Sequence, residues 1–95
     1  MNNSATIVRV SGETQNLTSR PTLAEAQNTV EGYIELVKAR SKQDTRPVTL
    51  VVNEDGRSLN LPLNKVITEE YGQSIYQGYI VGDVIVLKGW QTVGS

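Results

Sequence analysis

A run of β-branched and apolar residues leads to Asp-Gly in the segment Val48-Thr49-Leu50-Val51-Val52-Asn53-Glu54-Asp55-Gly56-Arg57-Ser58-Leu59-Asn60-Leu61-Pro62. Two strand-like runs joined by Asp-Gly are typical of a β-hairpin, because a type I′ turn needs positive φ at both central residues. Glycine adopts positive φ without steric cost, and aspartate tolerates it better than most residues. The sequence therefore predicts a hairpin that turns at Asp55-Gly56, with the rest of the chain packed around it.

The residues before this segment predict a strand and then a helix. Residues 5–10 form a short apolar run, and the polar residues 11–21 predict a connection. Thr22 and Glu25 have the Thr-x-x-Glu spacing of a capping box, in which each side chain binds the other residue's backbone amide. The helical face that we expect to be buried holds Leu23, Ala26 and Val30.

The segment after this helix is open to two interpretations. A continued helix would place Ile34 and Val37 on the same face as Val30. A helix that ends at Gly32 would leave residues 33–38 as a strand, with glycine in a left-handed position. Glycine inside a helix costs about 1 kcal/mol relative to alanine, and the β-branched residues suit a strand. These two effects favour the strand without excluding the helix.

The remaining segments complete a small α+β domain. Residues 63–72 are mixed and could include a short helical turn, whereas residues 75–81 and 84–87 resemble strands. We expect residues 1–4 and 91–95 to be frayed.

The predicted architecture is a single domain over residues 1–95, with a core spanning roughly residues 5–90. It has a mostly antiparallel sheet of about four strands, one helix packed on the sheet, and a polar loop at residues 39–47.

Composition limits the possible chemistry. The net charge is −1, and the chain contains no cysteine and no histidine. Disulfides, thiol nucleophiles, the usual zinc ligands and the most common general base are therefore absent. Met1–Ser4 has neither a basic nor an apolar segment of a signal peptide, and no apolar run reaches the ~20 residues of a membrane span. We expect a cytoplasmic protein that binds no membrane and carries no cofactor.

Three segments occur in a recognisable order: Thr22-Leu23-Ala24-Glu25-Ala26 with Val30-Glu31-Gly32-Tyr33-Ile34-Glu35-Leu36-Val37, then Val51-Val52-Asn53-Glu54-Asp55-Gly56-Arg57 with Leu61-Pro62-Leu63-Asn64, then Gly78-Tyr79-Ile80-Val81-Gly82-Asp83-Val84-Ile85-Val86. Together they resemble domain-of-unknown-function family 3846, a group of small phage and mobile-element proteins. The resemblance covers most of residues 22–88. The chain departs from the family in its long polar stretch 39–47 and in Ala39-Arg40-Ser41.

This resemblance implies that the helix ends at Gly32 and that a strand follows. It supplies no catalytic residues to place on this chain. It also implies a phage origin, because small proteins of this type resemble phage accessory products, many of which bind a host protein.

The basic residues of the polar loop are candidates for binding nucleic acid or an acidic protein. Four of the nine basic residues fall within nine positions: Lys38, Arg40, Lys42 and Arg46. Cations at this density can contact phosphate. However, Asp44 lies among them, no aromatic residue is interleaved and no groove-reading motif is present, so a solvated or protein-binding loop is favoured.

Aromatic residues gather in the last part of the chain. Tyrosine and tryptophan are enriched where interfaces bury large side chains, although they can equally complete a core that lacks phenylalanine. The candidate contact residues are Tyr76, Tyr79 and Trp90, with Tyr71 as a further aromatic in this region. Trp90, close to the expected frayed end, is the strongest of them.

Other candidate sites have simpler structural interpretations. Asp44, Glu54 and Asp55 lack the spacing of a calcium loop, so a solvated turn is favoured over a metal site. Asn64 can cap a following helical turn, which is favoured over ligand binding. Ser58 and Ser74 lie in no catalytic motif, and we expect no enzymatic activity.

These observations lead to three functional hypotheses. The first is a non-enzymatic phage accessory protein that modulates a host protein of the transcription or defence machinery, through a strand edge, the basic loop 40–46 and the aromatics near Trp90. The second is a nucleic-acid-associated module that uses the basic loop 38–46. The third is a self-assembling structural protein, since open sheet edges can pair across a twofold axis, and a homodimer is one such form.

Overall fold

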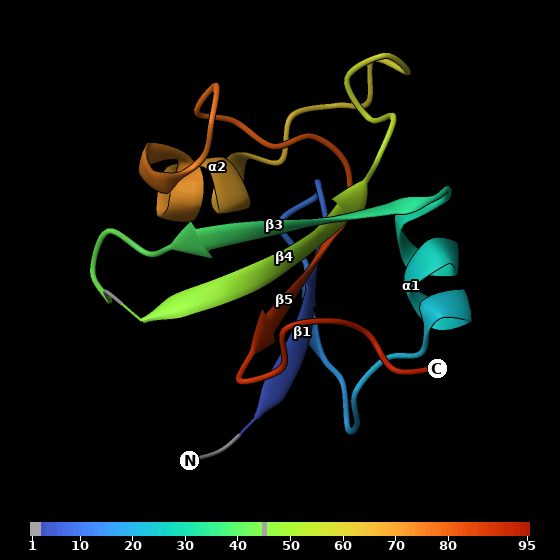
Figure 1. The fold of residues 1–95 in the computed structure, drawn as a ribbon. Helices are drawn as coiled ribbons and strands as arrows, with labels where there is room; N and C mark the ends of the chain where they lie inside the picture. The colour runs from blue at the N-terminus through green and yellow to red at the C-terminus, as the bar shows by residue number, and fades with distance from the viewer. Residues whose placement is uncertain (1–2, 45) are drawn as a thin grey trace.

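Five antiparallel strands form one sheet between two helices in the computed structural model of the chain (Figure 1). The structure describes residues 3–44 and 46–95. The strands are β1 (Ser4–Val8), β2 (Thr14–Asn16), β3 (Ile34–Arg40), β4 (Pro47–Asn53) and β5 (Val84–Lys88), in the order β2-β1-β5-β4-β3. The helices are α1 (Leu23–Val30), α2 (Lys65–Tyr71) and the short 3-10 helix η1 (Gly72–Ser74).

The sheet confirms the predicted α+β class and adds one strand and one helix to it. The additional strand, β2, lies within the segment predicted to be a polar connection, and all three of its residues are exposed. It pairs with the outer edge of β1, with Ile7 opposite Gln15. Because β2 buries no side chain, its sequence lacks the apolar alternation by which strands are recognised.

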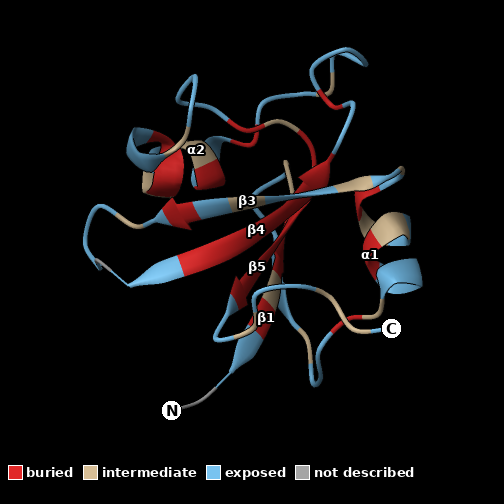
Figure 2. Cartoon of the chain, viewed as in Figure 1, coloured by how far each residue is buried: buried red, intermediate tan, exposed pale blue. Residues whose placement is uncertain are grey.

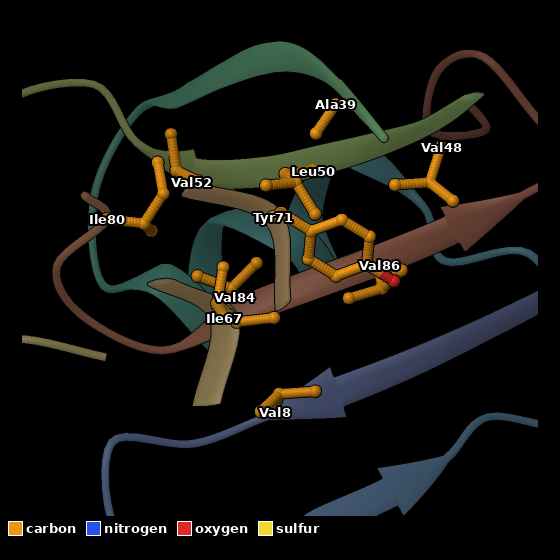
Figure 3. Close-up of a cluster of buried hydrophobic side chains, with 10 residues drawn as sticks. All are labelled: Val8, Ala39, Val48, Leu50, Val52, Ile67, Tyr71, Ile80, Val84 and Val86. Atoms are coloured by element: carbon orange, nitrogen blue, oxygen red, sulfur yellow. The ribbon is translucent and has the colours of Figure 1, made fainter. Parts of the chain in front are cut away.

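The two faces of the sheet each carry a hydrophobic cluster, because successive residues of a strand point to opposite faces. Leu50 belongs to the cluster under α2, and its neighbour Val51 belongs to the cluster under α1. Figure 3 shows the α2-side cluster, in which Tyr71 lies over Leu50 and Val86. The predicted single helix is therefore corrected to two helices on opposite faces, and the central strands β4 and β5 are buried between them (Figure 2).

The predicted hairpin at Asp55-Gly56 is wrong. β4 instead pairs with the preceding strand, β3, through the loop 41–46, and residues 54–60 form successive turns. Gly56 does not have the positive φ of a type I′ turn. The cause is Asn53, whose side-chain oxygen accepts a hydrogen bond from the Asp55 amide at 2.8 Å. The Asn53 side-chain amide in turn donates to the Val30 carbonyl at 3.0 Å, so the chain leaves the sheet instead of turning back along it.

The predicted strand at residues 75–81 is also wrong. Gln77 and Gly78 both have positive φ, which interrupts an extended backbone. Val81 forms only an isolated bridge with Leu63. The following strand prediction, residues 84–87, is confirmed by β5.

The structure resolves the two interpretations of the segment after α1. The capping box at Thr22 and Glu25 is present, and α1 ends at Val30 before strand β3. The left-handed residue is Glu31, with φ of 62°, and not Gly32. A Cβ at Gly32 would lie 2.7 Å from the Asn53 side-chain nitrogen, so glycine is needed there for close approach. Ala26 and Val30 are buried as predicted, whereas Leu23 is 44% exposed.

The C-terminal tail differs from the frayed end expected for residues 91–95. The Gly94 amide donates to the Pro21 carbonyl at 2.8 Å, and the Leu23 amide donates to the Gly94 carbonyl at 3.0 Å. The Arg20 guanidinium donates to two further carbonyls of the tail, at residues 92 and 93. At the other end, Ser4 begins β1. The rest of the expected frayed N-terminus, residues 1 and 2, lies outside the described residues, as does Thr45 of the polar loop.

Asn64 connects three parts of the fold and is fully buried. Its side-chain oxygen accepts from the Ile67 amide at 3.1 Å, which confirms the predicted capping role at the start of α2. Its side-chain amide donates to the carbonyls of Val8 and Gly82, at 3.0 and 2.9 Å. The side chain thereby fixes α2 to the end of β1 and to the segment before β5.

We predict that Asn64→Ala lowers the free energy of unfolding by about 2–4 kcal/mol, because it removes a helix cap and leaves two buried carbonyls without donors. Asn64→Asp should also destabilise, since a carboxylate cannot donate to those carbonyls. Denaturant titration followed by circular dichroism measures both effects. Asn28→Ala, at an exposed position of α1, is the control and should change stability by less than about 0.5 kcal/mol. An Asn64→Ala effect no larger than this control would contradict the assignment.

Candidate binding cavity

A cavity of about 520 Å³ lies where the β3–β4 loop, the end of α2 and the residues after β5 approach one another. Its walls come from three separate parts of the sequence. The residues that line it are Lys38, Ser41, Gln43, Asp44, Arg46, Pro47, Val48, Thr49, Glu70, Tyr71, Lys88, Gly89, Trp90 and Gln91.

The cavity carries cations that the fold holds in place. Lys38 projects from β3, and its ammonium donates to the Thr49 hydroxyl on β4 at 3.2 Å. Lys88 is the exposed last residue of β5. The Arg46 guanidinium pairs with Asp44 at 3.0 Å. The hydrogen bonds from Arg46 lower the pKa of the Asp44 carboxyl, and the same pair raises the pKa of Arg46.

Two aromatic residues bring apolar surface to the same cavity from opposite faces of the sheet. Tyr71 packs in the α2-side cluster, and Trp90 is partly buried against the α1-side cluster. Burial raises the pKa of the Tyr71 hydroxyl, and the nearby carboxylates of Glu70 and Asp44 raise it further. The site therefore combines cations, carboxylates and aromatic rings.

The fold brings together three of the residues predicted to bind a partner. Lys38, Arg46 and Trp90 all line the cavity, although Trp90 is far from the other two in sequence. Arg40, the last residue of β3, and Lys42, in the β3–β4 loop, do not line the cavity. Their backbone amides instead donate to the Ser74 hydroxyl and the Glu70 carbonyl.

The other two predicted binding residues lie elsewhere. Tyr76 is 86% exposed and lines a separate groove of about 350 Å³ beside β3. The Tyr79 ring lies 4.6 Å from the Arg57 guanidinium, which also donates to the Tyr79 carbonyl. Sequence analysis missed Lys88, a single lysine at the end of an apolar strand, because only the strand pairing places it near the loop.

Within the part of the chain that the structure describes, no group of three histidine, cysteine, aspartate or glutamate residues is arranged to hold a metal ion. Glu54 and Asp55 follow β4, whereas Asp44 precedes it, so the strand separates them. Across residues 3–44 and 46–95, no buried side-chain nitrogen or oxygen lacks a hydrogen-bond partner. None of the described helices has the length and hydrophobicity needed to span a membrane.

The raised pKa of Tyr71 predicts how stability depends on alkaline pH. A group whose pKa is higher in the folded state than in the unfolded state stabilises the fold below its unfolded pKa, here 10.0, and loses that contribution as pH rises through the folded value. Unfolding midpoints in denaturant, measured from pH 8 to pH 11, should therefore fall more steeply for the wild type than for Tyr71→Phe. Parallel curves for the two proteins would mean that Tyr71 titrates normally. Tyr76→Phe, at an exposed position, is the matched control.

Comparison with known proteins finds one family. The family described as a domain of unknown function, DUF3846, matches residues 3–94. No curated protein and no solved structure matches the chain. Because the match extends over nearly the whole sequence, the chain belongs to the DUF3846 family.

Proposed function

We propose that the chain is a non-enzymatic binding module that docks a partner protein in the cavity around Trp90. The observation that carries this proposal is the convergence of Lys38, Arg46 and Trp90 on one cavity. Lys38 lies on β3, Arg46 lies in the β3–β4 loop, and Trp90 lies in the distant tail after β5. Lys88 and Tyr71 add a further cation and a further aromatic ring.

The composition of the cavity suits a protein partner. Interfaces between proteins combine buried aromatic anchors and arginine with a polar rim. Trp90 and Tyr71 supply the aromatic surface, while Lys38 and Lys88 supply cations that form no ion pair with any described residue. The partner surface that fits best presents carboxylates around an apolar side chain. The module would act by covering a site on that partner, since recognition of this kind requires no chemical step.

The biological setting of this proposal is a phage or mobile-element accessory protein that binds and modulates a host protein. Its support is membership of the DUF3846 family together with a chain that contains no histidine or cysteine. Transcription and defence proteins are the host targets that we consider first. In this setting the cytoplasm of the host cell is the place of action.

Nucleic-acid binding is the second candidate, and one feature of the fold favours it. One of the sequence arguments against it is that no aromatic residue lies among the basic ones, whereas the fold brings Trp90 into the lining of the same cavity as Lys38 and Arg46. Bases can stack on such a ring while cations contact phosphates. Asp44 and Glu70, however, line the same cavity and would repel phosphate, so a protein partner is preferred.

The test is affinity capture of the tagged protein from lysate of the cells that carry its gene, with and without nuclease, read by mass spectrometry. We expect one dominant protein to survive nuclease treatment. Affinity for that purified protein should fall at least about tenfold in Lys88→Glu and in Trp90→Ala. The control is Lys65→Glu, an exposed cation of α2 outside the cavity, which should bind as the wild type does.

Two outcomes would overturn this assignment. If nuclease removes every captured species and binding to a single-stranded oligonucleotide weakens as salt rises, the nucleic-acid candidate replaces it. If Lys88→Glu and Lys65→Glu bind the captured protein equally well, the cavity is not the contact surface. Circular dichroism of each variant separates loss of binding from loss of fold.

A further inference from the structure

β3 is an edge strand whose outer backbone groups can be identified from the ladder. The Glu54 amide donates to the Tyr33 carbonyl, which makes these two residues a hydrogen-bonded pair. In an antiparallel ladder such pairs alternate with pairs that point outward. The amides and carbonyls of Ile34, Leu36 and Lys38 therefore point away from β4, and within the described residues they form no backbone hydrogen bond to a turn or loop.

The open part of this edge is short and has a defined centre. At Arg40, the next outward-facing position, the amide donates to the Ser74 hydroxyl at 2.8 Å, so η1 covers the edge there. Before Ile34, the chain turns into α1 through Glu31 and Gly32. The outward-facing groups thus form a window of three residues centred on Leu36. In Figure 2, most of β3 is coloured as exposed or intermediate, whereas most of the neighbouring β4 is coloured as buried.

The charges around this window change sign from one end to the other. Exposed carboxylates gather near the start of β3, at Glu31, Glu35, Glu54 and Asp55, against the single cation Arg57. Cations gather near its end, at Lys38, Arg40, Lys42 and Arg46. Asp44, which is paired with Arg46, and Glu70, which accepts from the Ser41 hydroxyl, are the carboxylates there. A strand that runs antiparallel to β3 with this same charge pattern would place opposite charges together at both ends.

We propose that a second copy of this chain occupies the edge, with the two β3 strands antiparallel about a twofold axis at Leu36. In this register Leu36 faces its counterpart, and Ile34 of each copy faces Lys38 of the other. Each of the three pairs exchanges both of its backbone hydrogen bonds, so every outward group in both windows is used. A shift of two residues in either direction would leave some of these groups unpaired. The result is a continuous ten-stranded sheet with an isologous interface.

Exposed apolar and aromatic side chains lie around the same window. Leu36, at the proposed axis, is 41% exposed. Tyr33, 70% exposed, directly precedes β3, and Tyr76, 86% exposed, lines the groove beside Leu36. Among the described residues, Tyr76 and Tyr33 are the two most exposed large hydrophobic side chains. A second copy would cover apolar surface at the centre of the interface, with charge pairs toward its ends.

Leu36→Pro tests the backbone pairing directly. Its ring removes an outward amide but no hydrogen bond of the β3–β4 ladder, so the monomer should keep its fold by circular dichroism. Sedimentation equilibrium from about 1 µM to 1 mM should show a monomer–dimer equilibrium for the wild type. Leu36→Pro should raise the dimer dissociation constant at least about tenfold, and Leu36→Ala, which keeps the amide, should raise it less.

A charge exchange tests the antiparallel arrangement. Glu35→Lys with Glu54→Lys makes both ends of β3 basic, and Lys38→Glu with Lys42→Glu makes both ends acidic. Each double variant should be monomeric alone, because like charges then meet at both ends of the interface. An equimolar mixture of the two should dimerise again, and this heterodimer should weaken as salt rises.

The following results would overturn the proposal. If the wild type stays monomeric at about 1 mM by sedimentation, a second copy does not pair with β3. The edge would then be available to an extended segment of another protein. A dimer that Leu36→Pro does not weaken would have a different interface, and a mixture that fails to reassociate would exclude the antiparallel arrangement. Partner binding in the cavity is tested at Lys88 and Trp90, which are not on β3, so the two proposals can fail separately.

Discussion

The fold depends on one fully buried side chain that satisfies backbone groups from three segments. Asn64 caps α2 through its oxygen and donates from its amide to the carbonyls of Val8 and Gly82. A buried amide is stable only when its donors and acceptor are all used, and this one meets that condition. Since Val8 ends β1 and Gly82 precedes β5, the position of α2 is coupled to the centre of the sheet. The same interaction fixes the position of Glu70 and Tyr71, the two residues of α2 that line the candidate cavity.

Local structure could be predicted from the sequence where it depends on residues that are close together in the chain. The capping box at Thr22 and the cap at Asn64 act over three residues, and both are confirmed. The hairpin predicted at Asp55-Gly56 does not form, because the Asn53 side-chain amide donates a hydrogen bond to the Val30 carbonyl, 23 residues away. The free energy that favours a particular local turn is smaller than the free energy lost when a buried hydrogen bond of this kind is not formed. The strand β2 was missed because it buries none of its side chains.

The candidate site shows the same division between local and distant causes. Lys38 and Arg46 could be identified from their spacing, and Trp90 could be identified as a costly residue to expose. These three residues line one cavity because the strand order β5-β4-β3 places the end of β5 beside the β3–β4 loop. That order arises from pairing across the whole chain, with Thr49 opposite Leu87. No periodicity within a window of 10 or 20 residues carries this information, which is why Lys88 was not predicted.

The sheet order has a consequence for how the chain acquires its structure during synthesis. β5 joins β1 to β4, yet of the five strands in this sheet it leaves the ribosome after the other four. Until it emerges, the β1–β2 and β3–β4 hairpins have no strand to connect them, and neither hydrophobic cluster can close. Pairs distant in sequence form slowly because a long loop must close first. A nascent or truncated chain that stops before Val84 therefore exposes both faces of an incomplete sheet, which is the state most open to chaperones and proteases.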